Sequence, residues 1–89
     1  MSYPTHAESL PEYQSHRVVR AMKIAAIQWS EGGAQLLTAD ADPIPRRINV
    51  DLDYMIKHRP KVGGYYIAYD DGYESWSPSE AFEAGYSRL

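Results

Sequence analysis

The last third of the chain, residues 63–86, reads GGYYIAYDDGYESWSPSEAFEAGY and constrains the fold most strongly. Strand-forming residues lie on both sides of Asp71-Gly72, a strong hairpin signal because a type I′ turn needs positive φ at both central positions. Ser77-Pro78-Ser79-Glu80 then combines an N-cap serine, a proline at the first helical position and a glutamate three residues after the cap. This stretch predicts a β-hairpin followed by a short helix capped by Ser77.

Two registers of this hairpin are open. A two-residue loop at Asp71-Gly72 places Ile67 opposite Trp76, so that Trp76 shares the core face with Tyr65, Ile67 and Tyr69. A three-residue loop at 70–72 instead places Tyr66 opposite Trp76, and a slip of one residue reverses the face of a strand. The first register is favoured. The helix spans only two turns and is expected to dock on the hairpin through Phe82.

The segment His16–Trp29 fits either a strand or a helix, because its apolar residues match both periods. Two features favour the strand. Apart from Ser15 the segment has no N-cap signal, and it runs into Ser30-Glu31-Gly32-Gly33, a hairpin-type loop. We therefore expect Ala34–Ala39 to pair back antiparallel.

The middle of the chain predicts a loop, a short strand and a helix in that order. Two prolines within Asp40–Arg47 oppose both helix and sheet. Ile48–Val50 follows as a short strand, and Asp51 is the expected N-cap of a helix of about two turns. Arg59-Pro60 ends that helix, because the residue before a proline avoids the α region.

The chain of 89 residues has the length of one domain. Residues 1–12 carry two prolines and no apolar period, and we interpret them as a flexible N-terminal arm. Residues 13–89 are expected to form a single α+β domain. Its predicted architecture is a small antiparallel β-sheet of about four or five strands with two short helices, the last one packed on the C-terminal hairpin.

Composition excludes several classes of protein. A net charge of −3 and a pI near 5.5 give no bulk attraction to nucleic acid. The absence of cysteine excludes disulfides and cysteine-based zinc sites. No apolar run reaches the length of about 18 residues that a membrane span needs. We expect a protein without membrane association.

No residue pattern indicates catalysis. The spacing of the three histidines does not match that of metal ligands in known motifs. Asp70 and Asp71 belong to a hairpin turn rather than a calcium loop, and capping accounts for Ser77 without a nucleophilic role. The prediction is a protein that is not an enzyme and that uses neither a cofactor nor a metal.

One set of residues suggests ligand binding. Arginine forks hold phosphates, and tyrosine rings stack on bases. Together they predict capture of a nucleotide or cyclic nucleotide, at a subunit interface. The competing interpretation is that the tyrosines are core and the arginines are solvated or paired with acids, and it is favoured for most of these residues individually. Tyr66 and Tyr73 are expected to be the exposed ones, because small or polar residues flank them. The set comprises Arg17, Arg20, Lys23, Arg46, Arg47, Tyr66 and Tyr73.

Two stretches, residues 13–26 and 63–88, resemble a family of small uncharacterised proteins of tailed bacteriophages and prophages. The first reads YQSHRVVRAMKIAA, and the second follows the family's ending GYYxxYxDGYxSWSPxxAFExGY. The resemblance covers about half of the chain, and the middle does not share it. The family carries no assigned activity, so the resemblance implies a phage origin and no catalytic residues.

The function expected from this origin is a non-enzymatic binding protein that sequesters or blocks a component of the bacterial host. By analogy with other small phage proteins, it acts as a counter-defence sponge for a nucleotide-derived immune signal. Alternatives are a protein–protein inhibitor of a host defence or metabolic protein, and a minor virion or assembly component. We expect a homo-oligomer located in the host cytoplasm or in the virion.

Overall fold

A computed structural model of the chain describes residues 10–14, 18–39 and 45–88. Within these residues the α+β class is confirmed, with two short helices and antiparallel strands. The strands form two sheets, however, where the sequence predicted one. The elements are β1 (Glu12–Gln14), β2 (Val18–Lys23), β3 (Ala26–Ser30), β4 (Gly33–Leu37), β5 (Arg47–Asp51), α1 (Leu52–His58), β6 (Tyr65–Ala68), β7 (Glu74–Ser77), α2 (Ser79–Gly85) and β8 (Ser87–Arg88).

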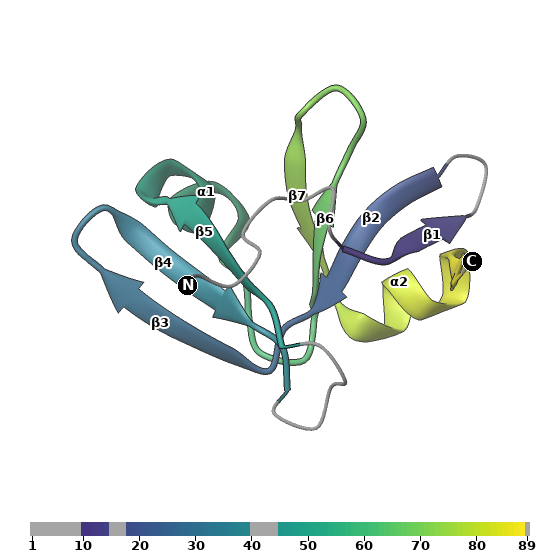
Figure 1. The fold of residues 1–89 in the computed structure, drawn as a ribbon, viewed down its shortest axis with the longest axis horizontal. Coiled ribbons are helices and arrows are strands. Elements are labelled where there is room, and N and C mark those ends of the chain that lie inside the picture. The colour runs from purple at the N-terminus through teal and green to yellow at the C-terminus, as the bar shows by residue number, and fades with distance from the viewer. Residues whose placement is uncertain (1–9, 15–17, 40–44, 89) are drawn as a thin grey trace.

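The two sheets lie side by side and each has its own helix (Figure 1). Sheet A has the order β7-β6-β2-β1-β8, and sheet B has the order β3-β4-β5. Helix α2 covers one face of sheet A. Helix α1 contacts β4 and β5 of sheet B and also β7 of sheet A, so it bridges the two sheets. Neither helix is long and apolar enough to cross a membrane, as far as the described residues go.

The segment His16–Trp29 is extended in its described part, 18–29, but it is not one strand. It bends at Ile24 and passes from β2 in sheet A to β3 in sheet B. At the bend, Ile24 N–H donates to the Gly64 carbonyl (2.8 Å) and Gly63 N–H donates to the Ile24 carbonyl (2.8 Å). The side chain of Ile24 is buried in the core between the sheets, which explains why apolar residues occur on both faces of the sequence pattern.

The predicted hairpin after this segment is confirmed. Ser30 pairs with Gly33, so Glu31-Gly32 forms the loop, and β4 pairs with β3 along its length. The predictions for the next two elements also hold. The short strand at Ile48–Val50 lies within β5, and the Asp51 carboxylate accepts a hydrogen bond from Tyr54 N–H at 2.8 Å, which caps α1.

The C-terminal hairpin adopts the register that was not favoured. Tyr66 pairs with Trp76, and Tyr69 N–H donates to the Tyr73 carbonyl across a three-residue loop, 70–72. Gly72 in this loop has φ +89°, a conformation that glycine adopts freely. The prediction that Trp76 shares a face with Tyr65 and Ile67 is therefore wrong, because the extra loop residue shifts β7 by one position.

Two hydrophobic cores lie on opposite faces of sheet A. The first fills the space between the sheets and α1, with Met22, Tyr66 and Leu36 among its buried residues. The second lies under α2 and contains Val19, Ala21, Tyr65, Ile67 and Phe82. The predicted docking of α2 through Phe82 is thus confirmed.

The described part of the chain extends further toward the N-terminus than the predicted domain boundary at Tyr13. Leu10 is 2% exposed and belongs to the first core. Glu12 pairs with Arg20 in strand β1. The predicted arm at 1–12 thus includes at least one core residue, and its residues 1–9 lie outside the described part.

The predicted Ser77 cap of α2 is wrong. Ser77 is the last residue of β7, the helix begins at Ser79 after an N-cap Pro78, and no side chain caps it. The Ser77 hydroxyl donates instead to the Pro78 carbonyl at 3.2 Å. Pairing with Tyr65 keeps Ser77 in the sheet, so it is not placed to bond the first turn of the helix.

This geometry predicts a small effect of Ser77→Ala. Loss of a serine cap costs about 1 kcal/mol, whereas loss of this exposed hydrogen bond is expected to cost less than about 0.5 kcal/mol. Urea unfolding followed by circular dichroism measures the difference. A loss of about 1 kcal/mol or more would show that Ser77 caps α2 in solution.

Candidate functional site

The six described residues of the predicted nucleotide set do not come together in one pocket. Tyr66, expected to be exposed, is 1% exposed and belongs to the first core, which corrects that prediction. Its hydroxyl donates to the Glu74 carboxylate. Tyr73 is 46% exposed, as expected. Tyr66 is buried because β6 is an inner strand of sheet A with a hydrophobic core on each of its faces, and the one-residue shift of the hairpin places Trp76 opposite it.

The basic residues of the first predicted strand do not converge. Arg17 lies outside the described residues. Arg20 and Lys23 are three positions apart on β2, so they face opposite sides of sheet A. Arg20 donates to the Leu10 carbonyl (3.1 Å) and pairs with Glu12 (3.3 Å). Lys23 lies toward α2, where its ammonium pairs with Glu83 at 3.3 Å.

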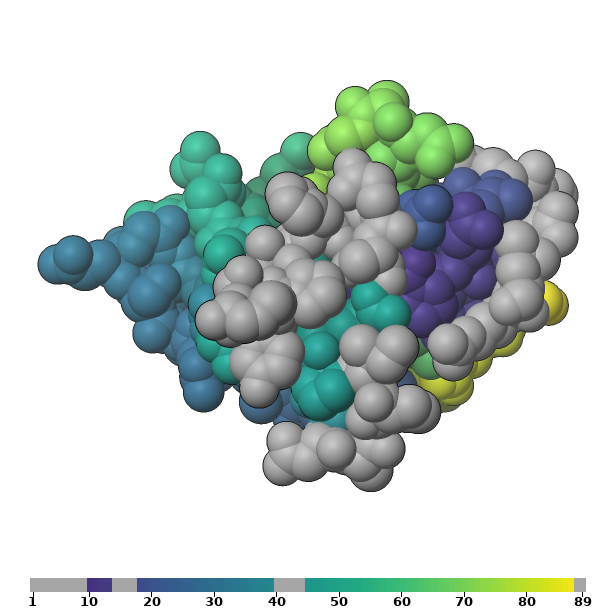
Figure 2. All heavy atoms as spheres, viewed as in Figure 1, coloured from purple at the N-terminus to yellow at the C-terminus, as the bar shows by residue number. Residues whose placement is uncertain are grey.

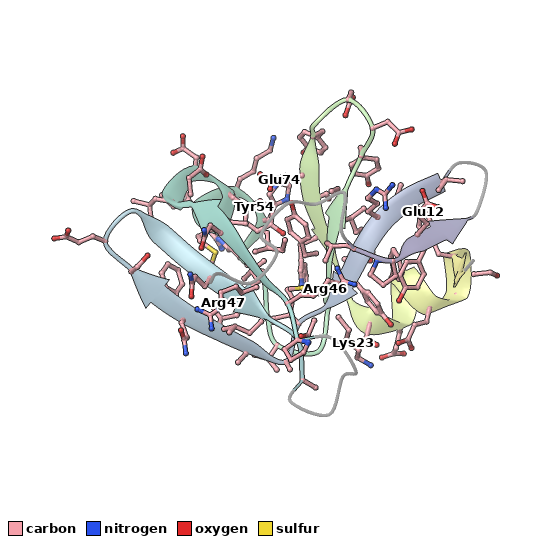
Figure 3. The ribbon with its side chains drawn as sticks, viewed as in Figure 1. Glu12, Lys23, Arg46, Arg47, Tyr54 and Glu74 are labelled. Atoms are coloured by element: carbon pink, nitrogen blue, oxygen red, sulfur yellow. The ribbon has the colours of Figure 1, made fainter. Side chains whose placement is uncertain are left out.

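Arg46 and Arg47 belong to the other sheet. Arg46 precedes β5, and its backbone N–H donates to the Thr38 hydroxyl at 2.8 Å. Arg47 pairs with Leu37 at the start of β5. In Figure 3, Arg47 lies over sheet B, Arg46 lies between the two sheets, and Lys23 lies at the end of β2 beside α2. The positive charges of the predicted set are thus divided between the two sheets and two faces.

A polar cluster lies where α1 meets β7, and Figure 3 shows Tyr54 and Glu74 there. The Tyr54 hydroxyl donates to the Ser75 carbonyl at 2.7 Å. The His58 ring lies 4.7 Å from the Tyr54 ring and hydrogen-bonds the Glu74 backbone. These contacts attach α1 to the outermost strand of sheet A.

The protonation of this cluster fits a structural role. Burial raises the pKa of Tyr54, and the negative charge of Glu74 acts in the same direction. Burial also lowers the pKa of His58, with a further contribution from the nearby Lys57 ammonium. Tyr54 and His58 are therefore held neutral near pH 7, which suits hydrogen-bond donors that join a helix to a strand.

The exposed side of the same helix carries an apolar pair beside the charged residues Asp53 and Lys57. Leu52 and Ile56 are 46% and 62% exposed, and they lie four residues apart, so they share one face of α1. Tyr73, at the hairpin tip, lies next to the helix: the Lys57 ammonium is 5.0 Å from its ring centroid and the His58 ring is 6.0 Å away. We call Leu52, Ile56, Lys57 and Tyr73 the α1 surface.

Interpretation of the sequence missed the α1 surface, although a signal was present. Leu52, Tyr54, Met55 and Ile56 spread apolar residues over about half of the circumference of a two-turn helix. This is wider than the apolar stripe of about 100° that a surface helix usually turns toward its core. Here Tyr54 and Met55 are buried and the other two are exposed, so the sequence carries more apolar surface on α1 than the fold of one chain covers.

Neither a metal-binding group among the described residues nor a match to a known protein indicates the function of this chain. In the described part of the chain, no group of three or more histidine, aspartate and glutamate side chains is arranged to hold a metal ion. No known protein-family model matches the sequence, and comparison with curated proteins and with solved structures finds no match. The functional argument therefore rests on the surfaces of the molecule.

Proposed function

We propose that this chain is a phage-encoded, non-enzymatic binding protein that blocks a host protein by docking the α1 surface into an apolar groove of its partner. The observation that carries the proposal is the exposed pair Leu52 and Ile56 on a helix whose opposite face is already packed. Helices that dock into grooves use anchors at such i and i+4 positions. The phage origin rests on the resemblance at residues 13–26 and 63–88.

The composition of the α1 surface suits a protein partner. Interfaces are enriched in aromatic residues and depleted of charge at their centres. Leu52 and Ile56 supply the apolar part, and Tyr73, which contacts α1 from the side of Lys57 and His58, supplies an aromatic ring with a polar hydroxyl. The hairpin tip that carries Tyr73 projects from the molecule (Figure 2), so a partner can approach it.

The nucleotide-sponge version of the function has weaker support. It requires stacking rings beside phosphate-binding arginines, but Tyr66 is buried. Arg20 and Lys23 also face opposite sides of sheet A. Binding of a nucleotide by the other residues of the predicted set stays a prediction. Mass spectrometry of the protein purified from bacterial cells tests it, because a sponge would carry a nucleotide through purification.

The test of protein blocking uses a matched pair of variants. Ile56→Lys places a charge at the centre of the α1 surface, whereas Val62→Lys changes a similarly exposed apolar residue (58%) in the loop after the helix. Wild-type protein immobilised on resin is exposed to bacterial lysate, and a retained protein is purified for calorimetry. We expect Ile56→Lys to weaken its binding at least about 10-fold, with Val62→Lys near wild type.

Two outcomes of this experiment contradict the proposal. If wild type and Ile56→Lys bind the purified partner equally, the α1 surface is not the docking site. If wild type retains no protein but carries a nucleotide, the sponge version is correct and the α1 surface has no blocking role. Both variants are first checked for unchanged circular dichroism and thermal unfolding.

A further inference from the structure

Among the described residues the two sheets have four edge strands, and three of them are protected against further pairing. Helix α1 covers β7 through the Tyr54 and His58 contacts. Strand β8 has only two residues. Strand β5 carries charged residues, Arg47 and Asp51, at its two ends. Short length, charge and a covering helix are the devices by which proteins prevent unwanted strand pairing.

The fourth edge, β3, has none of these protections. Its sequence Ala-Ile-Gln-Trp-Ser contains no charge and no proline. Four of its five residues are exposed, and Trp29 is exposed over 65% of its surface. The β3–β4 hairpin forms one end of the molecule in Figure 2. An exposed apolar edge strand of this kind is a template for another strand.

The pairing with β4 determines which backbone groups of β3 remain available. Ser30 and Gly33 close the two-residue loop, so Ser30, Gln28 and Ala26 form the hydrogen-bonded pairs with β4. The N–H and C=O groups of Ile27 and Trp29 therefore point to the open edge. The side chains of these two residues lie on the core face, with Ala34 and Leu36 opposite them.

Strand β3 is complementary to a copy of itself. If two copies pair antiparallel about an axis at Gln28, Ile27 lies opposite Trp29 of the second copy and Gln28 lies opposite Gln28 of the second copy. The available groups of Ile27 and Trp29 then form two hydrogen-bonded pairs with two bonds each, about four in total. A branched aliphatic side chain meets an aromatic ring, which stabilises strand pairs, and no like charges meet.

We propose that β3 is a homodimer interface, at which two copies of this chain pair antiparallel about a two-fold axis through Gln28. The product is a continuous six-stranded sheet in the order β5-β4-β3-β3-β4-β5. Isologous pairing of this kind closes on itself and leaves no open β3 edge. The interface is independent of the proposed function, because none of the residues of the α1 surface belongs to β3.

The oligomeric state is the first measurement. A single strand pair buries no more than about 1,200 Å², at the lower end of specific interfaces, where association is weak. Light scattering of the full chain over about 5–500 µM is expected to show a transition from the 10.1 kDa monomer to twice that mass. A mass that stays monomeric over this range overturns the proposal, and so does a larger assembly.

A charge exchange at Gln28 tests the position of the axis. Gln28 is exposed on the outer face of sheet B, so neither Gln28→Glu nor Gln28→Lys disturbs the core. Each variant alone places like charges directly opposite each other, and its Kd is expected to rise about 2- to 5-fold. An equimolar mixture of the two places opposite charges together, and dimers of mixed composition are expected with a Kd at or below that of wild type.

Native mass spectrometry with one variant labelled with ¹⁵N distinguishes mixed dimers from homodimers. The matched control is Asn49→Glu, an exposed outer-face change on β5, the other edge of sheet B. It is expected to leave the Kd unchanged. The proposal is overturned if Gln28→Glu does not weaken the dimer, or if Asn49→Glu weakens it equally, because the interface then lies elsewhere. It is also overturned if the mixture of the two Gln28 variants forms no mixed dimers.

Discussion

Replacement of Gly33 by alanine is expected to destabilise the protein by about 2–4 kcal/mol. Gly33 begins β4 with φ +153°, opposite Asp51 of β5. A Cβ atom added there would lie 2.0 Å from the Val50 carbonyl oxygen and 2.8 Å from Asp51 Cα. Both are backbone atoms of a paired strand, so relief of the overlap requires β5 to move away from β4. The melting temperature should fall by about 10–25 °C.

The neighbouring glycine provides the control for this prediction. A Cβ atom on Gly32 would meet no atom within 4 Å, so Gly32→Ala is expected to change stability by less than about 0.5 kcal/mol. Thermal unfolding of the two variants, one in the loop and one at the adjacent first position of β4, measures the close approach of β4 and β5. Equal melting temperatures would contradict the backbone geometry of sheet B.

Replacement of Phe82 by alanine is expected to cost about 3–5 kcal/mol, the range for a buried phenylalanine. Its ring is 1% exposed and stacks between Tyr65 (4.2 Å between centroids) and Tyr86 (4.5 Å). The Tyr13 ring approaches its edge at 4.9 Å. Phe82 is the one buried residue of α2, so truncation should release the helix from sheet A as well as create a cavity.

Urea unfolding of Phe82→Ala and of Tyr73→Ala separates this packing from the general effect of removing an aromatic ring. Tyr73 is 46% exposed, and its truncation is expected to cost less than about 1 kcal/mol. Small domains have about 5–10 kcal/mol of stability, so Phe82→Ala should be partly unfolded at 37 °C. Similar losses for both variants would mean that α2 does not depend on the second core.

The proposed dimer and the proposed docking surface use different parts of the molecule. Pairing of β3 uses backbone groups and a strand without charge, whereas α1 presents side chains from a helix that the first core already holds in place. A change at Gln28 is expected to alter self-association, and a change at Ile56 is expected to alter partner binding. A dimer would present two α1 surfaces, which increases the apparent affinity for a partner with two copies of the groove.

Local signals predicted most elements of the fold. Asp51 caps α1, the loop Glu31-Gly32 joins β3 to β4, and a strand forms at Ile48–Val50, because each depends on residues that are neighbours in sequence. The capping pattern at Ser77 was misleading because it too considers only residues that are neighbours in sequence. Its residues match a helix start, but pairing of Ser77 with Tyr65 is a tertiary interaction that keeps Ser77 in the strand.

The candidate site was less predictable than the elements. The aromatic and basic residues were identified by type, and side-chain type does not determine the direction in which a strand residue points. Both faces of β6 are buried, which covers Tyr66, and a shift of one residue in the hairpin loop placed Trp76 on its face. The bend at Ile24 separated the basic residues of β2 from the sheet that holds Arg47, and no local pattern marks this bend.

By itself the sequence determined the α+β class, the hairpins, α1 with its cap, the position of α2 and the docking residue Phe82. These follow from backbone propensities and periodicity, which act over a few residues. Only the tertiary structure decided the division into two sheets, the register of the last hairpin, and the exposure of Trp29, Leu52 and Ile56. Those outcomes depend on which surfaces meet when the sheets and α1 pack together, and packing is a property of the whole chain.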